Sequence, residues 1–171
     1  MTTTPRKFDS EIRISQSGDW IFRGQKITQE NVLEFFKKNI IEDEFGIYIR
    51  NSYAELVEHG YIGAKCIFLK IINSIVEDNI IYLIAEDESK TPIQDFYFYS
   101  DHEEKIFCMR KSDQFIKFNF NRHMHNFISN LMMEESGKYF LQLENSKIPI
   151  LPYDKPIEVE IPATYANSKN S

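Results

Sequence analysis

The sequence predicts an α+β fold: an N-terminal lobe with a β-hairpin and a helix, followed by an antiparallel β-roll or curled meander with one further helix. Aromatic residues, which favour strands, make up 14% of the 171 residues, whereas Gly and Pro number only six each. Apolar and polar residues alternate along most of the chain, and two segments show the spacing of a helix face. A hydrophobic content of 42% with 27% charged residues is typical of a globular chain.

The N-terminal lobe is predicted over residues 8–60, after a disordered tail at 1–7. Residues 8–14 alternate between apolar and polar types, as in a half-buried strand. Ser17-Gly18-Asp19 then indicates a turn, and residues 20–22 resume strand-like chemistry. These two strands are therefore expected to form a hairpin.

The first helix is predicted over residues 29–41 and is followed by a strand over 45–50. Thr28 is the expected N-cap, because its hydroxyl can accept from a backbone N–H of the first turn. Lys37 and Lys38 lie near the C-terminal end, where the helix dipole favours cations. The apolar stripe consists of Val32, Leu33, Phe36 and Ile40.

The second lobe is predicted over residues 61–151 as a meander. Short polar and mostly acidic connections separate alternating segments, a pattern that favours successive hairpins. From the end of the first lobe onward, strands are expected over 53–57, 65–75, 80–85, 95–99, 105–110 and 115–120. The acidic pairs of the chain fall in these connections or at helix ends, so they are interpreted as solvated turns.

The second helix is predicted over residues 121–134, with Asn121 as its N-cap and Gly137 just beyond its end. A final hairpin, over 138–143 and 147–150, precedes an extended tail at 152–171. The helical face consists of Met124, Phe127, Ile128, Leu131 and Met132.

Several functions are excluded by the composition. The net charge of −6, with 26 acidic against 20 basic residues, is unsuited to displacing counterions from nucleic acid. No apolar run reaches the roughly 20 residues that span a bilayer, and no apolar signal-peptide core follows the first residues. We therefore expect a cytoplasmic protein that binds neither nucleic acid nor a membrane.

Motifs for cofactor, metal or nucleophilic chemistry are absent from the sequence. No glycine pattern matches a known phosphate-binding loop, so no cofactor is predicted. Cys66 and Cys108 are expected to be free, buried and unreactive. His123 and His125 flank Met124 on the second helix, where successive residues turn by about 100° and the two imidazoles diverge. They are interpreted as half-exposed residues, with metal binding as the alternative.

Aromatic residues supply the remaining candidates. Trp20 is either a core residue of the first hairpin or an anchor that stacks on a ligand or partner. In the run from residue 96 to 99, Phe96 and Phe98 alternate with Tyr97 and Tyr99. If the two Phe face the core, the two Tyr form a half-exposed patch suited to self-association or peptide contact.

The order of features in the first lobe resembles an uncharacterised bacterial family, domain of unknown function 1285. The resemblance is carried by Glu11-Ile12-Arg13-Ile14, by the hairpin Gly18-Asp19-Trp20-Ile21-Phe22-Arg23-Gly24, and by Phe45-Gly46-Ile47-Tyr48 after a helix with Phe35-Phe36. It covers residues 8–48 and implies an N-terminal α+β lobe followed by a β-roll. It implies no activity, cofactor or catalytic residue.

Two hypotheses about function follow. The first is a non-catalytic binding or self-association module, hence a homo-oligomer, that uses the Tyr97 and Tyr99 sheet face. The second is an enzyme or binder of an unidentified small ligand, with a pocket between the two lobes. Its expected lining residues are Trp20, Arg23 and either His123 or His125.

Overall fold

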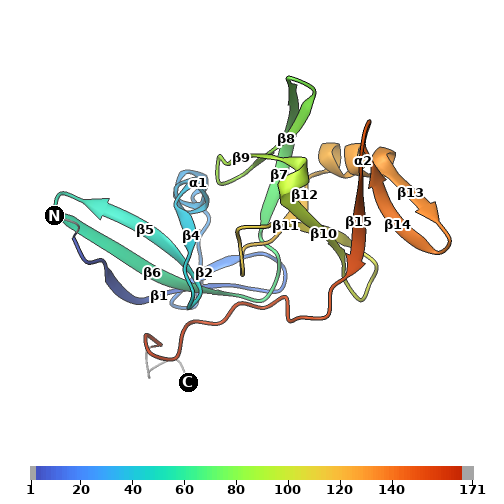
Figure 1. Cartoon of the computed structure of the whole chain (residues 1–171). Coiled ribbons are helices and arrows are strands. Elements are labelled where there is room, and N and C mark those ends of the chain that lie inside the picture. The colour runs from blue at the N-terminus through green and yellow to red at the C-terminus, as the bar shows by residue number, and fades with distance from the viewer. Residues whose placement is uncertain (1–2, 167–171) are drawn as a thin grey trace. The chain divides into compact units, whose positions relative to one another are not determined.

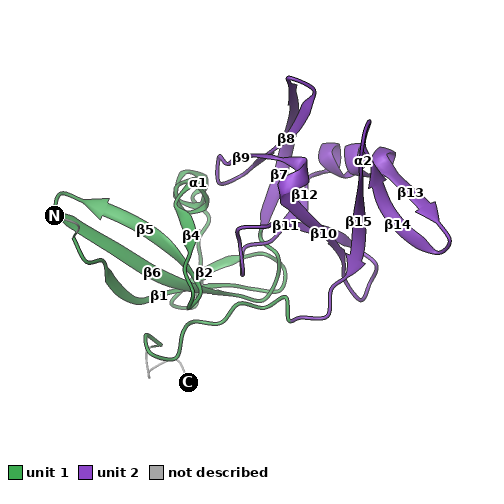
Figure 2. Ribbon diagram, viewed as in Figure 1, with its two compact units in different colours: residues 1–68, 156–171 green, residues 69–155 purple. Residues whose placement is uncertain are grey.

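The computed structural model describes residues 3–166 and divides the chain into two compact units. Unit 1 comprises residues 1–68 together with 156–171, and unit 2 comprises 69–155 (Figure 2). The segment after residue 155 therefore belongs with the N-terminal part of the chain. The sequence placed the division after residue 60 and treated 152–171 as an extended tail.

Unit 1 is built on an open six-stranded sheet in the order β3-β2-β1-β6-β5-β4 (Figure 1). Strands β1 and β6 pair in parallel, and every other neighbouring pair is antiparallel. Its strands are β1 (Arg6–Ile14), β2 (Trp20–Phe22), β3 (Gln25–Lys26), β4 (Ile40–Glu42), β5 (Ile47–Tyr53) and β6 (Leu56–Ala64). Strand β1 thus begins within the range predicted as a disordered tail.

The six-stranded sheet has one apolar face, because alternate side chains of each strand point the same way. Ile14 pairs with both Trp20 and Ala64, and all three side chains are buried. Helix α1 (Glu30–Lys38) is attached to this face by Phe36, whose ring stacks on Trp20 at 5.8 Å between centroids. The opposite face carries polar and aromatic side chains.

Unit 2 is built on an open nine-stranded sheet in the order β13-β14-β15-β10-β11-β12-β7-β8-β9, with parallel pairs at β10–β15 and β12–β7. Helix α2 (Arg122–Leu131) contacts β7, β12 and β14. The other elements are β7 (Leu69–Glu77), β8 (Ile80–Ala85), β9 (Lys90–Pro92), η1 (Ile93–Asp95), β10 (Phe96–Ser100), β11 (Ile106–Arg110), β12 (Phe118–Phe120), β13 (Met132–Glu135), β14 (Lys138–Gln142) and β15 (Lys147–Pro152).

The predicted α+β fold is confirmed, and both predicted helices are present but shorter. The N-cap of α1 is Gln29, not Thr28, and α1 ends before Ile40, which pairs with Ile49 as part of β4. Ile40 is buried, so it satisfies a helical stripe and a strand face equally well. Asn121 caps α2 as predicted, accepting a 2.9 Å hydrogen bond from the backbone N–H of Met124.

Helix α2 ends at Leu131 because Met132–Glu135 pairs with β14 as strand β13. Ser136 and Gly137, with φ of 54° and 79°, form the hairpin turn, so Gly137 does not terminate a helix. The predicted strand over 53–57 is also wrong. It contains the turn between β5 and β6, where Ala54 has φ of 51°.

No helix among residues 3–166 is long and apolar enough to cross a membrane.

Candidate functional site

A row of apolar side chains crosses one face of the nine-stranded sheet. Tyr99 pairs with Leu151, Phe140 with Pro149, and Met133 with Phe140. Paired residues share a face, as do residues two apart in one strand. We call six of the residues on this face the aromatic face: Tyr97, Tyr99, Met133, Phe140, Pro149 and Leu151.

The aromatic face is half open to solvent and half anchored. Tyr97, Met133 and Leu151 are 47%, 51% and 48% exposed. Tyr99 contacts the rings of Phe107, its pair in β11 on the same face, and of Tyr153, at ring-centroid distances of 5.7 and 4.9 Å. Burial raises the pKa of Tyr99, so its hydroxyl stays neutral at physiological pH. These are contact residues that offer shape and apolar area.

Charged groups lie at both ends of the aromatic face. The Lys111 ammonium lies 5.4 Å from the Tyr97 ring centroid. At the other end, Glu135 follows Met133 by two residues and accepts from Lys147 at 3.1 Å. Lys138 pairs with Glu135 on the same face, so this end carries two ammonium groups and one carboxylate, and both ends of the row are cationic.

The polar face of the six-stranded sheet carries a second cluster, centred on Asp43. Its carboxylate accepts from the Tyr61 hydroxyl at 2.5 Å, from the Lys7 ammonium at 3.3 Å, and from the backbone N–H groups of Phe45 and Gly46. Burial opposes the charge, but these donors together hold the pKa of Asp43 below its usual value. Burial and the hydrogen bond to Asp43 raise the pKa of Tyr61.

His59 lies beside this cluster with one ring nitrogen unsatisfied. Its ring stacks on Tyr48 at 4.0 Å, and its buried Nδ1 has no hydrogen-bond partner within the described residues. Burial, and next the nearby Lys7 ammonium, lower the pKa of His59. His59, Tyr48 and Arg50 line a cavity of about 580 Å³.

We expect His59→Phe to weaken the pH dependence of stability. The lowered pKa means that the unfolded chain takes up this proton at higher pH than the folded chain. Stability in the unchanged protein should therefore fall as the pH decreases through about 6.5, the ordinary histidine value. Phe keeps the stack on Tyr48 and removes both nitrogens, so the variant should lose this component.

Urea unfolding between pH 7 and pH 5 measures the effect. His102→Gln, an exposed change in the turn between β10 and β11, is the matched control and should keep the original slope. An unchanged slope in His59→Phe would contradict the expectation.

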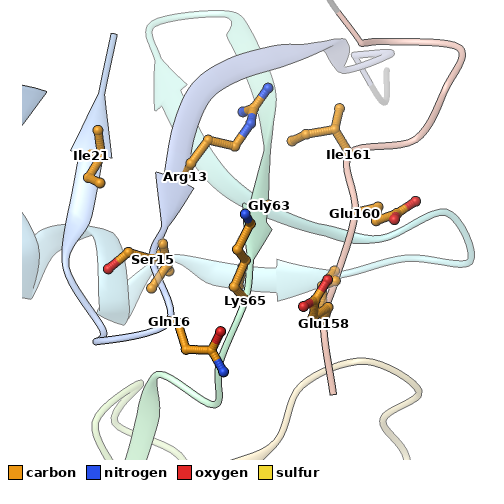
Figure 3. Close-up of a pocket in the computed structure, with 12 residues that line it drawn as sticks. Arg13, Ser15, Gln16, Ile21, Gly63, Lys65, Glu158, Glu160 and Ile161 are labelled. Carbon is orange, nitrogen blue, oxygen red and sulfur yellow. The ribbon is translucent and has the colours of Figure 1, made fainter. Parts of the chain in front are cut away.

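A larger cavity, of about 670 Å³, lies within unit 1 (Figure 3). Arg13 and Lys65, from β1 and just after β6, line one side, and Glu158 and Glu160 lie on the C-terminal segment, residues 156–166. That segment is fixed to the sheet because Val159 and Ala64 exchange two backbone hydrogen bonds of 2.8 Å.

Asp9 holds Arg13 in place through an irregularity in β1. Between Asp9 and Arg13, β1 uses four residue steps where β6 uses two, from Tyr61 to Gly63, and Glu11 in the bulge has φ of 63°. The bulge brings two side chains together that a regular strand would separate by about 13 Å. The fully buried Asp9 carboxylate accepts from Nη1 and Nη2 of Arg13 at 2.9 and 2.8 Å.

The residues singled out in the sequence are dispersed. Trp20 is buried in the core of unit 1, and Arg23 is exposed in the turn between β2 and β3, where it pairs with Glu11. His123 and His125 are exposed on α2 in unit 2. None of these four lines either cavity described above. Tyr97 and Tyr99 share one face, as alternation predicted.

The cysteines lie apart from both cavities. Cys108 is fully buried in β11, and burial raises its pKa well above the usual value. Cys66 lies after β6 rather than in a strand, and burial raises its pKa as well. Within residues 3–166, no group of three His, Cys, Asp or Glu side chains is placed to hold a metal ion.

Sequence reasoning missed the Asp9–Arg13 pair, the Asp43 cluster and His59. Asp9 and Arg13 are four residues apart, a spacing that brings side chains together on a helix but not on a regular strand, so their contact is not expected from the sequence. His59 lies in β6, whose apolar pattern is interrupted by Gly60 and Gly63. A glutamate at position 11 does not indicate a positive φ, as a glycine there would.

No protein-family model and no curated protein sequence matches the chain. Among solved structures it is similar to a DUF1285 family protein from Silicibacter pomeroyi DSS-3, with a TM-score of 0.60 and 14% identity over 85% of this chain and 82% of that one. It is also similar to a DUF1285 family protein from Shewanella baltica OS155, with a TM-score of 0.44 and 10% identity over 69% of this chain and 90% of that one.

The chain is therefore an α+β protein of two units, and its fold is that of the Silicibacter pomeroyi protein. The resemblance to domain of unknown function 1285 predicted from the sequence is confirmed at the level of the fold.

Proposed function

We propose that the protein is a non-catalytic binding module that self-associates through the aromatic face. The observation that carries this proposal is the row of half-exposed apolar side chains that continues across β13, β14, β15 and β10. Large apolar side chains aligned on one exposed sheet face are typical of contact surfaces. The face offers no nucleophile, no metal ligands and no acid–base pair, which favours binding over catalysis.

A second copy of the chain is the occupant that we propose, because a row of half-exposed apolar side chains can pack against the same row of another copy. In a two-fold dimer whose axis lies in the interface and perpendicular to the row, each end of the row in one copy contacts the opposite end in the other copy. The Lys111 end of one copy then meets the end of the other that carries Glu135, Lys138 and Lys147. Met133 meets Tyr97 in the same arrangement, and sulfur–aromatic contacts are favourable.

The exposed area indicates a weak dimer. A half-exposed Tyr such as Tyr97 offers roughly 100 Å², and three such residues offer on the order of 300 Å². Stable interfaces bury about 800 Å² on each partner. Association through this face should therefore have a dissociation constant of about 10–100 μM.

Tyr97→Ser and Met133→Ser should each shift the protein toward the monomer. Either change removes the apolar contact between Tyr97 of one copy and Met133 of the other and should weaken the dimer about tenfold or more. Sedimentation equilibrium or light scattering over a concentration series measures the shift. Tyr139→Ser is the matched control, because Tyr139 is 50% exposed on the other face of β14 and should leave association unchanged.

A charge exchange tests the two-fold arrangement itself. Lys111→Glu should strengthen the dimer, because the end that it meets carries Lys138 and Lys147 against Glu135, and adding Glu135→Lys should strengthen it further. A protein that remains monomeric well above 100 μM, or a dimer insensitive to Tyr97→Ser, would overturn the proposal.

A further inference from the structure

We infer that the Arg13–Lys65–Glu158 cavity binds a small zwitterion, a free amino acid or a short peptide, with its carboxylate on Arg13 and its ammonium group on the two glutamates of the C-terminal segment. This site lies entirely within unit 1 and does not depend on the aromatic face.

Arg13 has one donor edge available. A guanidinium has five N–H donors arranged as a fork on two edges. Asp9 takes the end formed by Nη1 and Nη2, and Nη1 also donates to the carbonyl of Ile12 at 3.1 Å. The Nε–H has no hydrogen-bond partner within residues 3–166, and with the second hydrogen of Nη2 it forms a side edge that suits a second carboxylate.

Gly63 leaves room for the Arg13 side chain to lie against strand β6. A Cβ at residue 63 would lie 3.2 Å from Cδ of Arg13, 3.7 Å from its Nε and 3.5 Å from the carbonyl oxygen of Val159. A side chain there would therefore press on the guanidinium and on the C-terminal segment. The glycine permits strand, guanidinium and segment to approach one another closely.

The C-terminal segment contributes two glutamates to the lining of the cavity. Glu158 and Glu160 flank the buried Val159, and residues two apart in an extended segment point the same way. Neither glutamate has an ion-pair partner among the described residues. Lys65, which lines the other side of the cavity, has none among them either. Figure 3 shows Arg13 and Lys65 on one side of the cavity and the C-terminal segment on the other, with the Glu160 carboxylate directed away from Arg13 in this view.

The charges select a zwitterion over a simple ion. Asp9 neutralises Arg13, so Lys65 supplies one net positive charge against two negative charges from Glu158 and Glu160. A simple anion would gain the guanidinium edge but meet two carboxylates, and a simple cation would leave the edge unused. A zwitterion satisfies both sides.

The remaining lining residues and the volume of the cavity limit the side chain and the size of the ligand. Ile21, which pairs with Arg13 and shares its face, and Ile161 provide a surface for an aliphatic side chain, and the volume of about 670 Å³ lies in the range of small-ligand sites. The apolar lining residues are Ile14, Ile21, Ala64, Val159 and Ile161.

Calorimetric titration with four probes tests the inference. L-Leucine and L-leucyl-L-leucine carry both charges, 4-methylpentanoate lacks the amine, and 3-methylbutylamine lacks the carboxylate. At least one of the two zwitterions should bind, with a dissociation constant of about 0.1–1 mM, and at least tenfold tighter than the singly charged probes. The ratio of the two zwitterions distinguishes a free amino acid from a peptide.

Two variants place the ligand in this cavity. The double variant Glu158→Gln with Glu160→Gln should weaken binding of the zwitterion about tenfold, so that its affinity approaches that of 4-methylpentanoate. The exposed change Glu144→Gln is the control and should alter neither affinity. Arg13→Lys keeps the charge, removes the fork, and should weaken the zwitterion in the same way. Because Arg13 pairs with the buried Asp9 carboxylate, the folding of Arg13→Lys is checked first. The glutamate variant changes only exposed residues, so it tests the site even if Arg13→Lys does not fold.

The inference is overturned by absence of binding to all four probes. It is overturned as well by 4-methylpentanoate binding the unchanged protein as tightly as the zwitterions, or by zwitterion binding that the glutamate variant leaves unchanged.

Discussion

Trp20→Ala should lower the free energy of unfolding by about 3–5 kcal/mol. Trp20 is 4% exposed, stacks on Phe36 of α1 and meets the ring of Phe68 edge-on at 5.5 Å. Truncation would leave a large cavity between the sheet and the helix. No residue of α1 is itself buried, so the helix has little other attachment to compensate.

Urea unfolding measures the loss, and Phe35→Ala is the matched control. Phe35 is the neighbour of Phe36 on α1 but is 48% exposed, so its removal should cost less than about 1 kcal/mol. A cost below about 1 kcal/mol for Trp20→Ala would mean that the ring does not hold the helix, and would restore the interpretation of Trp20 as a contact residue for a ligand.

Local patterns predicted much of the fold. The first hairpin follows from a turn sequence between two alternating segments, and Asn121 was recognisable as a cap beside a gapless helical stripe. Strand β6 could not be predicted, because Gly60 and Gly63 interrupt its apolar alternation. Its parallel pairing with β1 also joins segments about 50 residues apart, and no local signal specifies such a partner.

The candidate sites divide in the same way. Alternation alone placed Tyr97 and Tyr99 on one face, since strand geometry fixes that relation. The pairing of Asp9 with Arg13 depends on a bulge, and the position of Glu158 depends on a segment that returns to the sheet near Ala64. Both contacts depend on tertiary structure. The cavity in unit 1 therefore became visible only in three dimensions.

Arg110→Met should lower the free energy of unfolding by about 3–5 kcal/mol, because the variant leaves two buried carboxylates without their cation. Arg110 donates through Nη1 to Asp87 at 2.9 Å and through Nε to Asp113 at 2.5 Å. The three side chains are 16%, 7% and 10% exposed. Burial opposes the charge on Arg110, yet its two acidic partners raise its pKa, so the cation persists at any ordinary pH.

Removing all three charges should cost much less than removing one. Arg110→Met combined with Asp87→Asn and Asp113→Asn eliminates the uncompensated carboxylates, and neutral replacements of a buried ionic group are often tolerated. Lys90→Met is the matched control, because its 2.7 Å pair with Glu77 is exposed and should be worth less than about 1 kcal/mol. Equal losses for Arg110→Met and Lys90→Met in urea unfolding would contradict the argument, since burial is the property that separates the two pairs.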